Sequence, residues 1–344
     1  MMTTDFTIDR SKNLNSNDHS RKKVKWKVDI EKSVLSEIFE RRENWLRSYN
    51  DDWNFYWASA QIVQTIFHPE KGCRLNDNQI VNHFPNFYEL TRKDMMVRNI
   101  RRYMKELNRQ AGKNGHNDEL DDFLPVTYIL PSDWSIFSEE AKSRNPGTLW
   151  ILKPACGAQG KGIVIFHKLE NIKKWCGGRL MGKDSPNVTF VISRYVENPL
   201  LIGRRKFDLR IYVLVTSYRP LHVYLGDGFA RFCGSNYSND TVNMNNRFVH
   251  LTNVSVQKNN DCYNNIHGGK WSLANLRLFL ESTKGFQPTQ KLFSAIDDII
   301  VHSLKAVQNV MINDRHCFEC YGYDLLIDSN LKPWLVEINA SPSL

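Results

Sequence analysis

Two short hydrophobic runs near the end of the chain show the alternation of a β-hairpin. Tyr323–Ile327 and Trp334–Asn339 are rich in aromatic and branched side chains, which favour strands, and the turn-forming segment Asp328–Asn330 separates them. Because successive strand side chains point to opposite faces, Glu337 and Asn339 lie on the same face. Polar side chains therefore occupy positions where a core strand would carry Val or Leu.

The pairing of the two strands decides whether this hairpin could hold a metal ion. If the loop pairs Ile327 with Trp334, Asp324 falls opposite Glu337, on the face that also carries Asn339. Magnesium takes oxygen ligands of this kind, usually one or two carboxylates together with substrate phosphates. A solvent-facing edge hairpin would carry the same residues without any function, so the hairpin alone leaves both interpretations open.

From Pro125 onward the hydrophobic pattern predicts further strands and two helices, at about Trp271–Thr283 and Gln290–Met311. Strand groups that mix with helices, without strict alternation, favour an α+β fold of several layers. The expected strands are Val126–Leu130, Leu149–Leu152, Ile163–Phe166, Val188–Val196, Phe207–Thr216 and Leu221–Leu225.

Composition suggests how the chain is divided. Residues 1–22 are polar and predict a disordered tail. We expect an N-terminal domain over residues 23–122, which ends in the polar loop Gly112–Asp122, rich in Gly, Asn and Asp. A central domain over residues 123–196 and a C-terminal domain over 197–344, which includes the hairpin, would follow.

Length and charge narrow the class of protein. The chain of 344 residues is long enough for two or three packed units, and it has no apolar run that could span a membrane. Its start lacks the apolar segment of a secretory signal, and its seven cysteines show no disulfide framework, so we expect a cytoplasmic protein. The net charge of +9 implies an acidic partner: nucleic acid, an anionic membrane or an acidic protein surface.

A glycine-rich loop between two predicted strands is the second candidate site. The segment reads WILKPACGAQGKGIVIF, in which a strand ends at Lys153 and a loop with Gly157, Gly160 and Gly162 follows. Glycines let the backbone approach an anion closely, and backbone N–H groups together with Lys153 could hold phosphates. The loop is no Walker A motif, because a strand follows it. A common glycine-rich hairpin turn would show the same pattern.

Three further segments carry polar groups beside hydrophobic strands. Lys206, Asp208 and Arg210 alternate along one strand, which indicates either a polar cleft or a solvent-facing surface. The pair Thr252–Asn253 offers small hydrogen-bonding groups. Lys270 follows two glycines and could hold an anion or simply precede a helix.

With these segments together, the sequence resembles the tubulin tyrosine ligase-like family of ATP-grasp amino-acid ligases. The matching segments, in the family's order, are WILKPACGAQGKGI, RKFDLRIYVLV, HLTNVSVQ and YGYDLLIDSNLKPWLVEINASPSL, with VKWKVDIEKSVL and NHFPNFYELTRKDMMVRNIRR upstream. The similarity runs from about Val24 to the last residue and is greatest to the catalytic subunit of a tubulin polyglutamylase complex. It implies an ATP-grasp fold with mixed sheets and flanking helices. Because relatives continue beyond the hairpin, it also implies a truncated C-terminal domain.

The resemblance assigns roles to individual residues. Groups implied to contact ATP lie at the phosphates, the adenine and the ribose: Lys153, Gln159, Gly160, Ser193, Arg194, Tyr195, Val196, Lys206, Phe207, Asp208, Thr252 and Asn253. Groups implied to hold Mg²⁺ are Asp324, Glu337 and Asn339. Groups implied to bind the incoming glutamate or the tubulin tail are Gln159, Arg231 and Lys270. Arg210, which would face the transferring phosphate, and Glu337 are the implied catalytic residues.

The function that this resemblance implies is ATP- and Mg²⁺-dependent tubulin polyglutamylation. Free glutamate would be ligated to glutamate side chains of tubulin C-terminal tails through an acyl phosphate, with the help of accessory subunits, in the cytoskeleton and at the cilium axoneme or basal body. An acidic tail suits a basic protein. Two alternatives stay open: glycine or tyrosine ligation, and a non-catalytic basic module that binds tubulin tails. No motif supports nucleic acid as the partner, and no membrane partner is expected.

Overall fold

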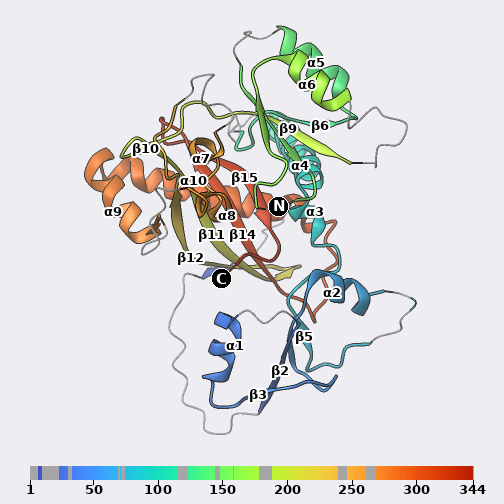
Figure 1. Ribbon diagram of the computed structural model, residues 1–344. Coiled ribbons are helices and arrows are strands. Elements are labelled where there is room, and N and C mark those ends of the chain that lie inside the picture. The colour runs from blue at the N-terminus through green and yellow to red at the C-terminus, as the bar shows by residue number, and fades with distance from the viewer. Residues whose placement is uncertain are drawn as a thin grey trace.

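The computed structural model describes residues 7–9, 23–29, 33–68, 70, 74–114, 122–143, 148–157, 159–177, 188–238, 246–260 and 269–343. Within these residues the strands form three sheets, and a central seven-stranded sheet lies between two four-stranded ones (Figure 1). None of the helices in the described ranges is long and apolar enough to cross a membrane.

The central sheet carries the hairpin that closes the chain. Its order is β1-β12-β11-β14-β15, with β10 beside β11 and β13 beside β12. The strands are β1 (Thr7–Asp9), β10 (Leu201–Ile202), β11 (Arg205–Tyr218), β12 (Leu221–Phe232), β13 (Lys270–Ser272), β14 (Glu319–Ile327) and β15 (Pro333–Asn339).

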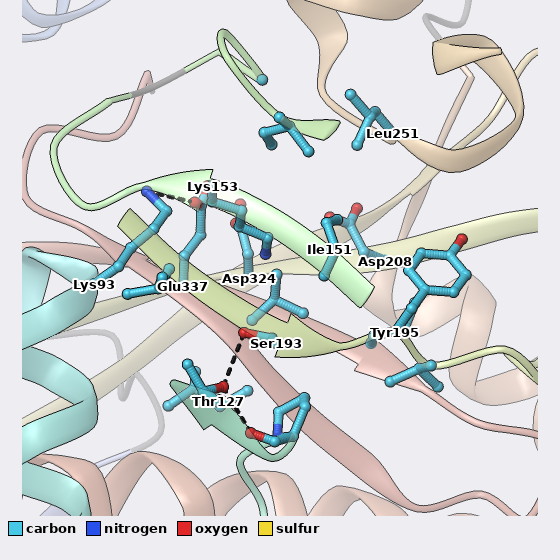
Figure 2. A pocket seen from close by; sticks show the side chains of 18 of the residues that line it. Lys93, Thr127, Ile151, Lys153, Ser193, Tyr195, Asp208, Leu251, Asp324 and Glu337 are labelled. Atoms are coloured by element: carbon cyan, nitrogen blue, oxygen red, sulfur yellow. Dashed lines mark hydrogen bonds and ion pairs between the residues drawn. The ribbon is translucent and has the colours of Figure 1, made fainter. Parts of the chain in front are cut away.

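Alternation along β11 explains how this sheet serves two purposes. Phe207, Leu209 and Ile211 point to the apolar core, whereas the intervening Asp208 and Arg210 point to the other face. Both sets are buried, so the polar face of β11 is not solvent-facing, and it contributes Asp208 to a cavity (Figure 2). The sequence was compatible with either a polar cleft or a solvent-facing surface at this strand, and the structure shows a cleft.

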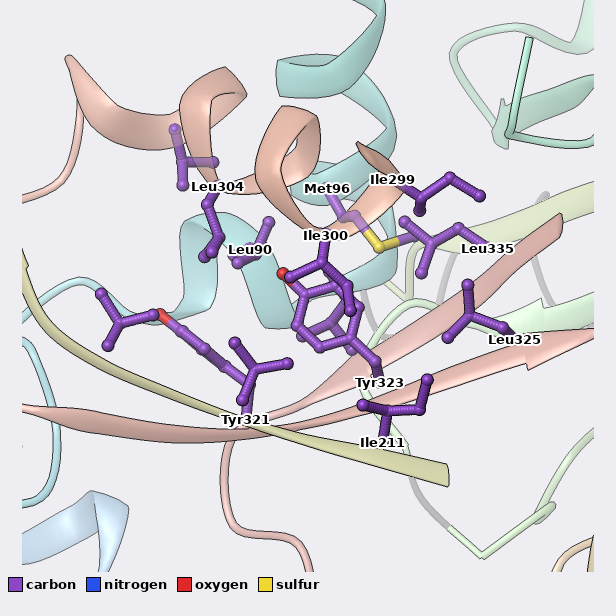
Figure 3. Packing of buried hydrophobic residues seen from close by; sticks show 14 of the residues in the cluster. Leu90, Met96, Ile211, Ile299, Ile300, Leu304, Tyr321, Tyr323, Leu325 and Leu335 are labelled. Atoms are coloured by element: carbon purple, nitrogen blue, oxygen red, sulfur yellow. The ribbon is translucent and has the colours of Figure 1, made fainter. Parts of the chain in front are cut away.

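The core lies between the other face of this sheet and helices from both halves of the chain. Tyr323 and Leu325 of β14 pack under Ile300 of α10 (Phe286–Gln308), with Leu90 of α3 (Tyr88–Thr91) and Met96 of α4 (Lys93–Asn114) beside them (Figure 3). α9 (Leu273–Lys284) packs against α10. The Tyr323 hydroxyl finds a partner in Ser303 at 2.9 Å, as a buried tyrosine requires. Helices of the N-terminal region therefore share the core of the C-terminal sheet.

The two smaller sheets each have helices of their own. One is antiparallel, in the order β6-β9-β7-β8, and the other is parallel, in the order β3-β2-β4-β5. The first comprises β6 (Thr127–Leu130), β7 (Trp150–Pro154), β8 (Val164–Phe166) and β9 (Phe190–Arg194), with α5 (Trp134–Ser143) and α6 (Leu169–Gly177). The second comprises β2 (Val24–Val28), β3 (Trp45–Arg47), β4 (Phe55–Trp57) and β5 (Ile80–Val81), with α1 (Ser33–Glu40) and α2 (Ala60–Ile66).

The predicted hairpin is present, but its register differs from the expected one. Ile327 pairs with Pro333 and not with Trp334, which is a shift of one residue. A β-bulge then intervenes, so that Asp324 nevertheless pairs with Glu337 as expected. The bulge compensates for the error in the predicted register.

Two local expectations were wrong. Thr7–Asp9, assigned to a disordered tail, form β1, because the edge of β12 offers unpaired backbone groups to a parallel partner. The remainder of residues 1–22 lies outside the described ranges. The polar loop expected from Gly112 begins later, since α4 continues to Asn114. The domain boundaries themselves stay predictions.

A buried hydrogen-bonded pair joins the N-terminal region to the central sheet. His83 Nδ1 lies 2.6 Å from Glu319 Oε1, and the Phe84 N–H donates to Glu319 Oε2 at 3.1 Å. Burial raises the pKa of Glu319, although the charge of His83 opposes this shift. An exposed pair, Arg315 with Asp77, joins the same two regions at the surface.

These two pairs allow a matched comparison. Glu319→Gln should lower the free energy of unfolding by about 1–3 kcal/mol, because it disturbs the buried hydrogen bonds of this carboxyl group with His83 and the Phe84 N–H. Asp77→Asn should leave the melting temperature nearly unchanged, since water screens that pair. Urea denaturation of both variants measures the difference. Equal stability of the two variants would contradict the structural role of Glu319.

Candidate active site

A cavity between the central sheet and the β6–β9 sheet collects most of the residues that the sequence singled out. The segment from α7 (Arg247–His250) to α8 (Val254–Gln257) lies along it, and the start of α4 closes one side (Figure 2). The predicted residues that line it are Lys153, Gly160, Ser193, Arg194, Tyr195, Val196, Lys206, Asp208, Thr252, Asn253, Asp324 and Glu337. Strand ends that are distant in the sequence thus form one site.

Two lysines place buried ammonium groups in this cavity. The side chains of Lys153 and Lys206 are buried, and among the described residues no direct ion pair joins either ammonium to a carboxylate. Burial lowers the pKa of both groups, to about 8 for Lys153. Buried cations of this kind indicate a site for an anion.

A third lysine, Lys93, was missed by the sequence analysis. It stands at the start of α4, where its Nζ lies 3.1 Å from Glu337 Oε2 and donates to the Gly157 carbonyl at 3.0 Å (Figure 2). In the sequence, Thr91 is followed three residues later by Asp94, a spacing typical of a helix N-terminus, and α4 begins there at Lys93. The pattern gave no sign that this lysine points inward.

The carboxylates of Asp324 and Glu337 face the cavity from paired positions of β14 and β15. Burial opposes the ionisation of Glu337, but Lys93 and Lys153 outweigh it and lower its pKa to about 2. Burial raises the pKa of Asp324, although Arg231 and Arg210 act against the shift. As the pH rises, Glu337 therefore loses its proton before Asp324 does.

The oxygen set of the hairpin fits a magnesium ion. Asp324 and Glu337 are adjacent carboxylates, and the Asn339 amide donates to the Gly322 carbonyl at 3.3 Å, which leaves the Asn339 oxygen as an acceptor. Hard cations take such ligands together with phosphate oxygens. The described residues contain no group of three or more His, Cys, Asp or Glu that could hold a metal, so Asn339 and a bound phosphate would have to complete the shell.

Two arginines bind the acidic groups at the edge of this site. Arg210 Nε donates to Asp324 at 2.5 Å, and Arg231 bridges Asp208 and Asp324, the latter at 2.9 Å. Gly322 makes room for this arrangement, because a Cβ there would lie 3.3 Å from Arg210 Cδ and 2.8 Å from the Pro342 ring. The charges of both arginines are thus already matched by aspartates.

Lys270 extends the cationic region beyond the arginines. It pairs with Arg231 across β12 and β13, its side chain is largely exposed, and its Nζ lies 4.7 Å from the centre of the Phe229 ring. Burial and the charges of Arg231 and Lys258 lower the pKa of Lys270. In the described part of the chain it forms no ion pair, which leaves it available to an acidic ligand.

Some predicted residues lie outside the cavity wall. Phe207 points into the core, where its ring packs 5.2 Å from that of Phe232, because it alternates with Lys206 and Asp208. Gln159 is exposed, and its carbonyl accepts from Ser255 at 3.2 Å. Arg210 and Arg231 adjoin the cavity through their contacts with Asp324, whereas Lys270 and Asn339 are not part of its lining.

The glycine-rich loop lies against the segment that follows α7. Gly160 has φ +69°, which favours glycine, and a Cβ there would lie 3.3 Å from Asn253 Oδ1 and 3.2 Å from Val256. Arg247 donates to the Gly160 carbonyl. The loop is thereby held over the end of the cavity that contains Lys153.

Comparison with known proteins agrees with this geometry. A model of the tubulin-tyrosine ligase family matches residues 70–344. The chain belongs to this family. Membership confirms the predicted family and ATP-grasp fold class, and it confirms an ATP-dependent ligase.

Several relatives within the tubulin-tyrosine ligase family are similar over most of this chain. "Probable alpha-tubulin polyglutamylase Ttll1" of Tetrahymena thermophila is 53% identical over 335 residues, 94% of this chain and 81% of that protein. "Probable tubulin polyglutamylase ttll-9" of Caenorhabditis elegans is 40% identical and covers 100% of this chain and 80% of its own length. Human "Tubulin polyglutamylase TTLL5" is 35% identical over 85% of this chain but only 22% of itself.

The pKa of Lys153 gives a prediction for nucleotide affinity. An anion binds the protonated form, and the unliganded protein loses this proton above about pH 8. The affinity for ATP, measured with EDTA to exclude metal, should be constant at lower pH and then fall by up to about tenfold for each further pH unit.

Lys153→Met is the control for this profile. It should bind ATP weakly and show no break near pH 8, because Lys153 no longer titrates. Isothermal titration between about pH 7 and about pH 9.5 covers the range. A wild-type affinity that stays constant throughout would refute the role of this ammonium.

Proposed function

We propose that the protein is an ATP- and Mg²⁺-dependent tubulin polyglutamylase, which ligates free glutamate to glutamate side chains of tubulin C-terminal tails. Relatives over nearly the whole chain are named tubulin polyglutamylases. The net charge of +9 favours association with an acidic tail. Action on tubulin would place the protein at the cytoskeleton, including the axoneme or basal body of cilia, and the participation of accessory subunits is part of the proposal.

One observation carries the chemical part of the proposal. The buried ammonium groups of Lys153 and Lys206 lie in the same cavity as the carboxylates of Glu337 and Asp324. Buried ammonium groups without a direct carboxylate contact favour a polyphosphate, and adjacent carboxylates favour the divalent cation that accompanies it. A site for a neutral ligand would need neither group.

The residues of the chain would act by position and charge. A carboxylate oxygen of the acceptor glutamate attacks the γ-phosphorus of ATP, which forms an acyl phosphate and releases ADP. The amine of free glutamate then attacks the acyl carbon, phosphate leaves, and the nitrogen loses a proton. Lys153 and Lys206 offset the negative charge that develops on the transferred group, and Arg210, which is bound to Asp324, would act beside them. A bound Mg²⁺ would polarise the phosphate oxygens.

The cations around Arg231 bear on which amino acid is ligated. Arg231 is bound by Asp208 and Asp324, whereas Lys270 forms no ion pair in the described ranges. An acidic amino acid could match the charge of Lys270, and glycine or tyrosine could not match it with a side chain. This observation favours glutamate, although the same family includes ligases of other amino acids.

The direct test is the transfer of labelled glutamate to tubulin in the presence of ATP and magnesium. Glu337→Gln should abolish the transfer, because it removes a metal ligand and leaves Lys93 and Lys153 without their counter-charge. Glu281→Gln, in a half-buried ion pair with Arg277 on α9, should retain it. If the isolated chain is silent, the assay uses the complex assembled from ciliary extract. Undiminished transfer by Glu337→Gln would end the metal-site proposal.

A second variant tests the choice of amino acid. Lys270→Met should raise the KM for glutamate by about tenfold, as expected for the loss of one charged contact, and leave nucleotide affinity unchanged. Lys284→Met, in the last turn of α9, is the control. Labelled glycine and tyrosine are supplied in competition. Preferential incorporation of either, or a glutamate KM that does not respond to Lys270→Met, would exclude this role.

A further inference from the structure

The ammonium of Lys206 is held in the cavity by uncharged groups. Its Nζ donates to the Tyr195 hydroxyl at 2.9 Å and to the His250 carbonyl at 3.1 Å. It also lies 4.5 Å from the centre of the Tyr195 ring and 5.9 Å from that of Tyr237. A lysine stem is flexible and its ammonium is strongly hydrated, so a buried and fixed position requires such partners.

The direction of the hydrogen bonds made by Lys206 follows from the chemistry of its ammonium. An ammonium can only donate, so the Tyr195 oxygen accepts from Lys206 and directs its own proton elsewhere. His250 Nδ1 lies 2.9 Å from this hydroxyl and is hydrogen-bonded to it. Lys206, Tyr195 and His250 therefore form a chain of hydrogen bonds that begins at the ammonium.

This chain connects two walls of the cavity. Tyr195 follows β9, and its ring packs with Leu149 and Ile165. His250 ends α7, and Lys206 stands on β11. An ammonium has three N–H donors, of which the described contacts use two. The hydrogen bonds to Tyr195 and His250 fix the directions of two N–H bonds of the ammonium, and the direction of the third N–H bond is thereby restricted.

We propose that Tyr195, with its hydroxyl oriented by His250, is a positioning residue that fixes the Lys206 ammonium for the bound nucleotide. This inference rests on the proposed function, because it presumes that the cavity binds ATP. The hydroxyl of Tyr195 would contribute through Lys206 and would not itself need to contact the nucleotide.

Tyr195→Phe removes the hydroxyl and retains the ring that packs with Leu149 and Ile165. We expect the Kd for ATP, measured by calorimetry, to rise by about three- to tenfold, as for the loss of one hydrogen bond. Tyr103→Phe is the matched control, since Tyr103 hydrogen-bonds His302 Nδ1 at 2.8 Å, in contact between α4 and α10. Its Kd should equal that of the wild type, although both variants lose a tyrosine–histidine bond and some thermal stability.

A second comparison separates positioning from general destabilisation. In a Lys206→Met background, Tyr195→Phe should not change the Kd further, because the residue through which it acts is gone. If Tyr195→Phe fails to fold, His250→Leu replaces it in the same cycle, since it removes the hydrogen-bond partner that orients the hydroxyl.

Each outcome decides the matter. An effect of Tyr195→Phe that is absent from Tyr103→Phe and from the Lys206→Met background supports the inference. An unchanged Kd in Tyr195→Phe, equal losses in both phenylalanine variants, or an effect that persists without Lys206 overturns it. Failure of the wild type to bind ATP at all would instead refute the proposed function, and the inference with it.

Discussion

The carboxylate of Glu337 is the group on which the arrangement of the site depends. It receives Lys93 from α4 at 3.1 Å, and its low pKa reflects the charges of Lys93 and Lys153. Removal of each of these charges from water costs several kcal/mol, which only mutual attraction and hydrogen bonding can offset. The charges of Lys93, Lys153 and Glu337 can therefore be buried only when the start of α4, the end of β7 and the hairpin lie together.

Apolar packing fixes the position of the start of α4 relative to the hairpin. Met96 and Val97 follow Lys93 by one turn of α4 and are buried against the same core as Leu325 and Leu335 of the hairpin. A shift of the helix would expose these side chains, at about 25 cal/mol for each Å² of apolar surface. The position of a cavity lysine is thus determined by the hydrophobic face of its helix, and the core supports the chemistry of the site.

The features that could be predicted from the sequence are those encoded by a pattern over a few neighbouring residues. The hairpin, the polar ladder Lys206–Arg210 and the glycine-rich turn each follow from alternation or from residue type over a few positions. The inward direction of Lys93 and the engagement of Arg231 by two aspartates arise from contacts between distant segments, which no local pattern encodes. The resemblance to a family supplied the adenine segment around Tyr195. Phe207 shows the limit of assigning ligand contacts from a family resemblance. It lies between Lys206 and Asp208 on a strand, so alternation already requires its side chain to face the core.

The bulge in β15 shows how one backbone feature reconciles the core with the site. Leu335 pairs with Leu325 on the core face, so in a regular strand Val336 would face the cavity opposite Asp324, and Glu337 would enter the apolar core opposite Tyr323. The extra residue at Val336 reverses this parity. Glu337 then pairs with Asp324 on the cavity face, while Ile338 pairs with Tyr323 and is buried. A strand that must fill a core at both ends and present a carboxylate in between needs such an irregularity. This is also why the regular register predicted from the sequence gave the right pair of carboxylates for the wrong reason.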